Sequence, residues 1–171
     1  ETEIKLLQEE FRISSKLLYY LPFQLEPISE EEKINLPGFE QRNNFISIGN
    51  FLHEPNWNAV LYLKEEIWPL IRRELPGAKL YIYGAYPSQK VWNLHNEKEG
   101  FIVKGRAENA EAVMRNAKVC LAPIRFGAGL KGKLIQAMQC GTPAVTTSLG
   151  AEGIPGDLAW NGYITNDPKE F

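Results

Sequence analysis

The sequence predicts an α/β protein with a Rossmann-like, doubly wound parallel sheet. Short apolar runs typical of buried strands recur along the chain, at residues 45–49, 80–84, 101–105, 119–123 and 144–147. The stretches between them carry apolar residues at helical spacing. Strands that alternate with helices indicate βαβ units, which join parallel strands through right-handed crossovers. We therefore expect one parallel sheet with helices on both faces.

Residues 56–74 form the clearest predicted helix. Asn56 is its candidate N-cap, and its apolar stripe consists of Val60, Leu63, Ile67, Leu70 and Ile71. Pro69 interrupts this stripe, so we expect a kink or one loosened turn there, because proline has no amide hydrogen to donate. Further helices are predicted at residues 88–94, 110–117 and 130–139.

The first 43 residues lack this alternation. Residues 2–11 predict a charged helix, residues 16–21 a short strand, and residues 23–43 an irregular linker rich in glutamate and proline. We assign residues 1–43 to a linker and the remnant of an inter-domain region, and residues 44–171 to one domain. The chain begins without methionine and stops directly after a helix-start pattern, so we expect a fragment trimmed at both ends.

The composition narrows the possible function classes. Hydrophobic residues make up 44% and charged residues 23%, as in ordinary soluble domains, and the net charge of -2 argues against nucleic-acid binding. No apolar run approaches the roughly 20 residues of a membrane span, and no signal-peptide pattern is present. We expect Cys120 and Cys140 to be buried free thiols, because their spacing from His53 and His95 fits no zinc site.

The richest loop follows the run that ends at residue 123. Its glycine-rich part, residues 127–130, reads Gly-Ala-Gly-Leu and directly precedes a predicted helix. Glycines permit tight turns and a close approach of backbone to a ligand. The first amides of a helix lack intrahelical acceptors, so a loop of this kind predicts an anion site at the carboxyl edge of the sheet.

Three cations surround this helix start, namely Arg125, Lys131 and Lys133. The helix dipole disfavours a cation there by about 0.3–1 kcal/mol, which favours an anion joining the cluster over three solvated side chains. We expect Lys131 to contact the anion and Lys133, two residues further on, to point elsewhere.

Two other loops reach the same edge. Gly49 and Asn50 follow the first strand, with His53 close behind, and Glu152 follows the last predicted strand. The alternative for Asn50 and Glu152 is that each only forms a turn.

At these loops the sequence resembles the group 1 glycosyltransferases of the GT-B fold. The resemblance is carried by FISIGNFLHEPNWNAV at residues 45–60, by PGAKLYIYGA at residues 76–85, and by VCLAPIRFGAGLKGKLIQAMQCGTPAVTTSLGAEG at residues 119–153. It implies two Rossmann-like domains, of which this chain holds the second. The resemblance further implies that this domain binds a nucleoside-diphosphate sugar and that a missing amino-terminal domain binds most of the acceptor. It also implies transfer with retention of configuration and no tightly bound metal or cofactor.

The resemblance assigns roles to particular residues. It implies that residues Gly127, Ala128, Gly129 and Leu130 line the diphosphate and sugar, and that Lys131 or Arg125 neutralises the diphosphate. Backbone near Val103 and Lys104 would meet the nucleobase, and Gln136 would face the ribose. The loop after Gly49 would also contact the donor.

The chain departs from the family pattern at three positions. Ala128 and Gln136 stand where many relatives carry two glutamates, and Asn50 stands where many carry arginine. No catalytic residue can therefore be assigned from the sequence.

We expect a cytoplasmic enzyme domain that builds a glycan or a lipid-linked product. A peripheral contact with the inner face of the membrane through the missing half stays open. The alternatives are a non-catalytic nucleotide-sugar-binding module and another GT-B enzyme, such as a nucleotide-sugar epimerase.

Overall fold

The computed structural model describes residues 2–21, 23–154 and 159–171 of the chain. The chain divides into two compact units, Glu1–Glu30 and Glu31–Phe171. In the first unit, α1 (Thr2–Glu9) confirms the predicted helix. The predicted strand at residues 16–21 is wrong: a 3₁₀ turn, η1 (Ser15–Leu17), occupies its start, and no described strand pairs with the rest. A strand without a neighbour gains no ladder of hydrogen bonds, which explains the difference.

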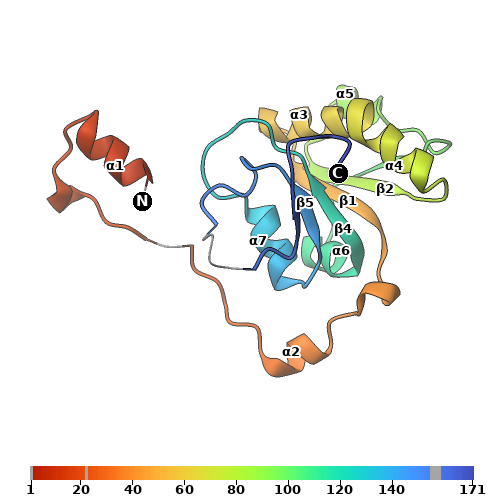
Figure 1. Ribbon diagram of the computed structural model, residues 1–171, viewed down its shortest axis with the longest axis horizontal. Coiled ribbons are helices and arrows are strands. Elements are labelled where there is room, and N and C mark those ends of the chain that lie inside the picture. Colours follow the sequence, from red (N-terminus) through yellow and green to blue (C-terminus); the bar gives the residue numbers. More distant parts are fainter. Residues whose placement is uncertain (1, 22, 155–158) are drawn as a thin grey trace. The chain divides into compact units, whose positions relative to one another are not determined.

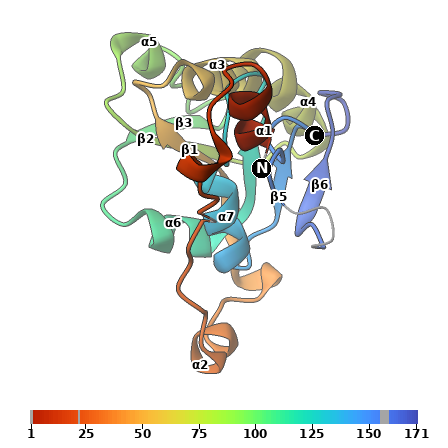
Figure 2. The same cartoon turned by 90° about the vertical axis from the view of Figure 1, so that its left-hand side faces the viewer.

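The second unit holds a parallel sheet whose strands, among the described residues, follow the order β3-β2-β1-β4-β5-β6. These strands are β1 (Asn43–Asn50), β2 (Leu80–Ala85), β3 (Phe101–Gly105), β4 (Ala117–Ala122), β5 (Ala144–Thr146) and β6 (Gly162–Ile164). The five predicted strands are confirmed. The short strand β6, which was not predicted, pairs with β5 at one edge of the sheet (Figure 2).

Helices cover both faces of the sheet (Figure 1). One face carries α3 (Glu54–Tyr62), α4 (Trp68–Glu74) and α5 (Gln89–Trp92), and the other carries α6 (Ala110–Asn116) and α7 (Gly132–Gln139). Each face has its own apolar core, centred on Leu63, Trp68, Ile82 and Phe101 on the first and on Ile46, Met114 and Leu134 on the second. Both cysteines are buried free thiols, as predicted. The doubly wound fold class is confirmed.

Pro69 loosens the long helix as the sequence predicts. Between α3 and α4 the chain makes a π-helical stretch, η3 (Leu63–Ile67), and Pro69 falls in the first turn of α4. Because proline cannot donate a hydrogen bond, it is tolerated at a helix start, and a wide turn can precede it. Leu63 and Ile67 nevertheless stay fully buried, so the helical stripe still packs on the sheet.

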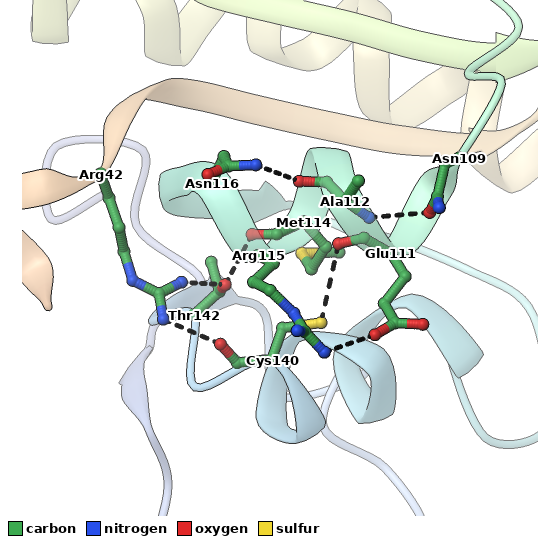
Figure 3. Close-up of polar contacts among 9 residues, drawn as sticks. All are labelled: Arg42, Asn109, Glu111, Ala112, Met114, Arg115, Asn116, Cys140 and Thr142. Carbon is green, nitrogen blue, oxygen red and sulfur yellow. Dashed lines mark hydrogen bonds and ion pairs between the residues drawn. The ribbon is translucent and has the colours of Figure 1, made fainter. Parts of the chain in front are cut away.

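Residues 31–43, predicted from the sequence to be linker, belong to the second unit. The short helix α2 (Glu30–Ile34) begins at the last residue of the first unit and continues into this segment, which also contains η2 (Phe39–Gln41). The side chain of Arg42 is only 4% exposed and donates from Nε to Pro37 O (2.9 Å), from Nη1 to Thr142 Oγ1 (2.6 Å) and from Nη2 to Cys140 O (2.8 Å). Figure 3 shows the guanidinium reaching these last two groups. Arg42 thus joins the segment before β1 to the carboxyl end of α7.

Candidate functional site

The strand order defines where a ligand can bind. The chain leaves β1 towards α3 on one face and leaves β4 towards α7 on the other. In doubly wound sheets the crevice at such a switch point, outside the carboxyl ends of the strands, is the usual ligand site. The loop after β1 and the glycine-rich loop after β4 both lie at this switch point, because β1 and β4 are neighbours.

The glycine-rich loop has a conformation that depends on its glycines. Gly127 and Gly129 adopt positive φ angles of 111° and 77°, which side chains with a β-carbon rarely allow. Lys131 Nζ donates to the carbonyl oxygens of Gly127 (3.0 Å) and Gly129 (2.5 Å). Lys131 therefore closes the loop on itself.

The start of α7 offers free donors beside this loop. Its N-cap residue is Lys131, which makes no side-chain cap hydrogen bond. The lysine side chain has no acceptor atom, so the amides of Gly132 and Lys133 gain no cap from it, whereas the amide of Leu134 donates to the carbonyl oxygen of Lys131 at 2.8 Å. Together with the positive end of the helix dipole, these amides favour an anion.

The side chain of Lys133 reaches the carboxyl end of β1. Its Nζ donates to Asn56 Oδ1 at 2.6 Å, and Asn56 Nδ2 donates to the carbonyl oxygen of Asn50 at 2.8 Å. A β-carbon added to Gly49 would lie 3.0 Å from Lys133 Nζ. Asn56 is not the helix cap, because α3 begins at Glu54 and His53 is its N-cap. The two asparagines instead hold Lys133 over the end of β1.

The environment of Lys133 is unusual for a cation. Burial lowers the pKa of Lys133 to about 8, against a smaller opposing effect of Cys120. Burial also raises the pKa of the Cys120 thiol to about 11, so this neighbour stays neutral near pH 8. Among the described residues Lys133 has no carboxylate partner within ion-pair distance.

Arg125 and Asn50 have local partners. Arg125 Nε donates to Asn58 Oδ1 at 2.8 Å, and its guanidinium lies 4.4 Å from the ring centre of Tyr62. The guanidinium group of Arg125 thus lies against α3. Asn50 Oδ1 accepts from the amide of Leu52 at 2.9 Å, so the Asn50 side chain forms the turn given above as its alternative.

Two residues near the end of β3 already have partners within the protein. The amide of Val103 donates to His95 Nδ1 at 3.2 Å, and Lys104 Nζ lies 4.9 Å from the ring centre of Tyr81. The Val103 amide therefore already donates to a side chain, and a ligand at this segment would have to contact other backbone or side-chain atoms.

The remaining predicted residues lie on the surface of this region. Ala128 and Leu130 are exposed in the glycine-rich loop, and Glu152 is exposed in the loop after β5. That loop approaches the glycine-rich loop, because a β-carbon at Gly153 would lie 3.1 Å from Leu130 Cδ2. Gln136 is half-buried on α7 and makes no side-chain hydrogen bond with the described residues.

The described part of the chain holds no cluster of three or more His, Cys, Asp or Glu side chains arranged for a metal ion. It also holds no helix with the length and apolar character needed to cross a membrane.

The comparisons with known proteins agree with this architecture. The family model for glycosyl transferases group 1 matches residues 42–171. A Klebsiella pneumoniae protein, described as an uncharacterized 44.6 kDa protein in the cps region, is 24% identical over 135 residues. The match covers 75% of this chain and 35% of that protein. The chain belongs to the group 1 glycosyl transferases.

Solved structures share the fold. TarM superimposes with a TM-score of 0.58 at 18% identity, over 73% of this chain and 25% of TarM. The pneumococcal O-GlcNAc transferase GtfA, solved with UDP and GlcNAc, gives 0.54 at 21% identity over 77% of this chain and 26% of its own. A UDP-forming trehalose-phosphate synthase from Burkholderia xenovorans gives 0.53 at 13% identity over 83% and 37%. The predicted GT-B type of Rossmann-like domain is confirmed, and the chain spans only part of these relatives.

Proposed function

We propose that this chain carries the donor site of a glycosyltransferase that uses a nucleoside-diphosphate sugar. The donor binds at the carboxyl edge of the sheet between β1 and β4, and the sugar is transferred with retention of configuration to a glycan or lipid-linked acceptor. One observation carries the proposal: the uncapped start of α7 and the glycine-rich loop lie together at the switch point of the sheet. The presence of UDP in the GtfA structure supports a nucleotide of this class.

The diphosphate is the part of the donor that this geometry fits best. Free helix amides and a cation are the usual partners of phosphate oxygens in proteins. The acceptor is assigned to the amino-terminal domain that the resemblance implies, as is any membrane contact. The donor is bound without a tightly held metal or cofactor in this proposal.

Nucleoside diphosphates should bind the 171-residue chain and perturb residues 127–136. The panel to use is UDP, GDP and ADP, ranked by thermal shift and titrated by calorimetry. Amide NMR then locates the site, with the strongest shifts expected in the glycine-rich loop and the first turn of α7. Shifts confined to the amino ends of the strands, or no binding by any member of the panel, would refute the proposal.

Gln136→Glu should tighten the binding of a ribonucleoside diphosphate about fivefold, or about 1 kcal/mol. Gln136 lies three residues after Lys133 on α7, so the two side chains share a face of the helix. A carboxylate accepts hydrogen bonds from both ribose hydroxyls, whereas an amide offers a single accepting oxygen. Calorimetric titration measures the gain.

Two controls isolate the ribose contact. A 2′,3′-dideoxy nucleotide should show no gain with Gln136→Glu, because its ribose hydroxyls are absent. Gln139→Glu places the same charge almost one turn further from the start of α7, at its last residue, and should leave affinity unchanged because it lies beyond the proposed ribose. An equal gain for both nucleotides means that Gln136 does not face the ribose.

A non-catalytic donor-binding module is the second candidate. Gln136 and Ala128 favour it, because they replace the two glutamates that many relatives carry. Sugar transfer by the full-length protein separates the candidates. Tight donor binding with no transfer to any plausible acceptor favours the module.

A further inference from the structure

We propose that Lys133 is the side chain that contacts the donor diphosphate, and that Lys131 acts only by holding the glycine-rich loop in shape. This inference rests on the donor site proposed above and reverses the roles that the sequence gives to the two lysines. It assigns a binding residue to α7 and a positioning residue to the loop before it.

The hydrogen bonds separate the two lysines. Lys131 Nζ has two of its three protons committed to the carbonyl oxygens of Gly127 and Gly129. Among the described residues Lys133 Nζ has one hydrogen-bond partner, Asn56 Oδ1, which leaves two protons for an incoming acceptor. Lys133 is therefore the better equipped of the two to bind phosphate oxygens.

The position of Lys133 points to the same conclusion. Its Nζ lies beside Gly49 at the end of β1, although its backbone lies in the first turn of α7. It therefore bridges the two elements that border the switch point. A side chain at Gly49 would overlap Asn56 and crowd Lys133. The glycine therefore provides the space in which Lys133 Nζ lies.

The electrostatic setting of Lys133 lacks an anion. Lys133 is half-buried, stands at the positive end of a helix, and has a second cation, Lys131, close by. Each of these conditions opposes a positive charge. The diphosphate supplies the missing negative charge, and it would restore the pKa of Lys133 towards the ordinary lysine range.

The placement also agrees with Gln136, which is proposed to face the ribose. Residues three apart on a helix lie on one face, as Lys133 and Gln136 do. Lys131 and Gln136 are five apart and do not share a face. A nucleotide that contacts Lys133 with its phosphates and Gln136 with its ribose therefore lies along one side of α7.

Lys133→Met and Lys131→Met form a matched pair, because each removes one lysine charge with little change in volume. We expect Lys133→Met to weaken UDP and GDP binding about 10- to 100-fold, and Lys131→Met to weaken it by less than about threefold. Uridine and guanosine, which lack phosphates, should bind equally to wild type and Lys133→Met. Lys133→Gln keeps an uncharged donor on a side chain one atom shorter, and it should show the same phosphate-dependent loss, which separates the missing charge from a folding defect.

The dependence of binding on pH gives a second readout. The titratable groups facing Lys133 are Cys120 on β4, whose pKa is raised to about 11, and Lys131 before α7. As the pH rises from 7 to 9.5, free Lys133 loses its proton, so diphosphate binding requires proton uptake and weakens. This loss should persist in Lys131→Met and disappear in Lys133→Met.

The outcomes distinguish the two proposals. Diphosphate binding by wild type that is weakened equally by both methionine variants, or only by Lys131→Met, overturns the role of Lys133 and leaves the donor site standing. Absence of any nucleoside-diphosphate binding by wild type overturns both. Loss of nucleoside as well as diphosphate affinity in Lys133→Gln means that the residue shapes the site and does not contact phosphate.

Discussion

Replacing Arg42 with methionine should lower the free energy of unfolding by about 3 kcal/mol. Methionine occupies a similar path but donates nothing, so Pro37 O, Cys140 O and Thr142 Oγ1 each lose a charged donor in a buried setting. Unmade hydrogen bonds of this kind cost about 1–3 kcal/mol each and do not add fully. Urea unfolding followed by tryptophan fluorescence measures the change.

Two variants calibrate the Arg42 measurement. Arg73→Met removes an exposed guanidinium that pairs with its neighbour Glu74 at 3.0 Å, and should change stability by less than about 0.5 kcal/mol. Arg42→Lys keeps the charge but loses the planar fork that serves three acceptors, so an intermediate loss is expected. An effect of Arg42→Met no larger than that of Arg73→Met would mean that the buried hydrogen bonds contribute little.

Gly84→Ala should destabilise the protein by about 2–3 kcal/mol. Gly84 is opposite Gly49 in the register of β2 and β1, and an added β-carbon would overlap the carbonyl oxygen of Gly49 and the ring of Phe51. The obstacle is backbone, which cannot move aside without separating the two strands. The same urea experiment measures the loss.

Gly132→Ala is the matched control for Gly84→Ala. A β-carbon at Gly132 meets nothing within 4 Å, and its backbone is helical. Alanine at such a position should leave stability unchanged or raise it by up to about 1 kcal/mol, because the unfolded chain loses freedom. If both alanine variants behave alike, packing at the β1–β2 end is looser than the structure indicates.

The sheet could be predicted from the sequence because its strands are buried. Four of the five predicted runs are mostly apolar and end in glycine or proline, which is a local pattern. β6 escaped prediction because Gly162–Ile164 is a short, exposed edge strand without that pattern. The failed strand at residues 16–21 had the pattern but lacked a described neighbour to pair with.

The directions of the two site lysines could not be predicted. The sequence places the helix start near Leu130, whereas α7 begins at Gly132. Lys131 is therefore the N-cap with extended backbone, and its direction does not follow the spacing of the helix. A shift of two residues is within the uncertainty of helix boundaries predicted from sequence. The contact of Lys133 with Asn56, distant in sequence, also follows only from the paired positions of β1 and β4.

The central place of β1 in the sheet sets the order in which the domain can assemble. Phe45 of β1 pairs with Leu80 of β2 on one side and with Val119 of β4, far later in the chain, on the other. Contacts distant in sequence form late and slow the folding of parallel sheets. During synthesis, β1 to β3 can therefore pair first, and the second edge of β1 stays unpaired until β4 has left the ribosome. The switch point is complete only when β4 has joined, so the ligand site is among the last parts of the domain to form.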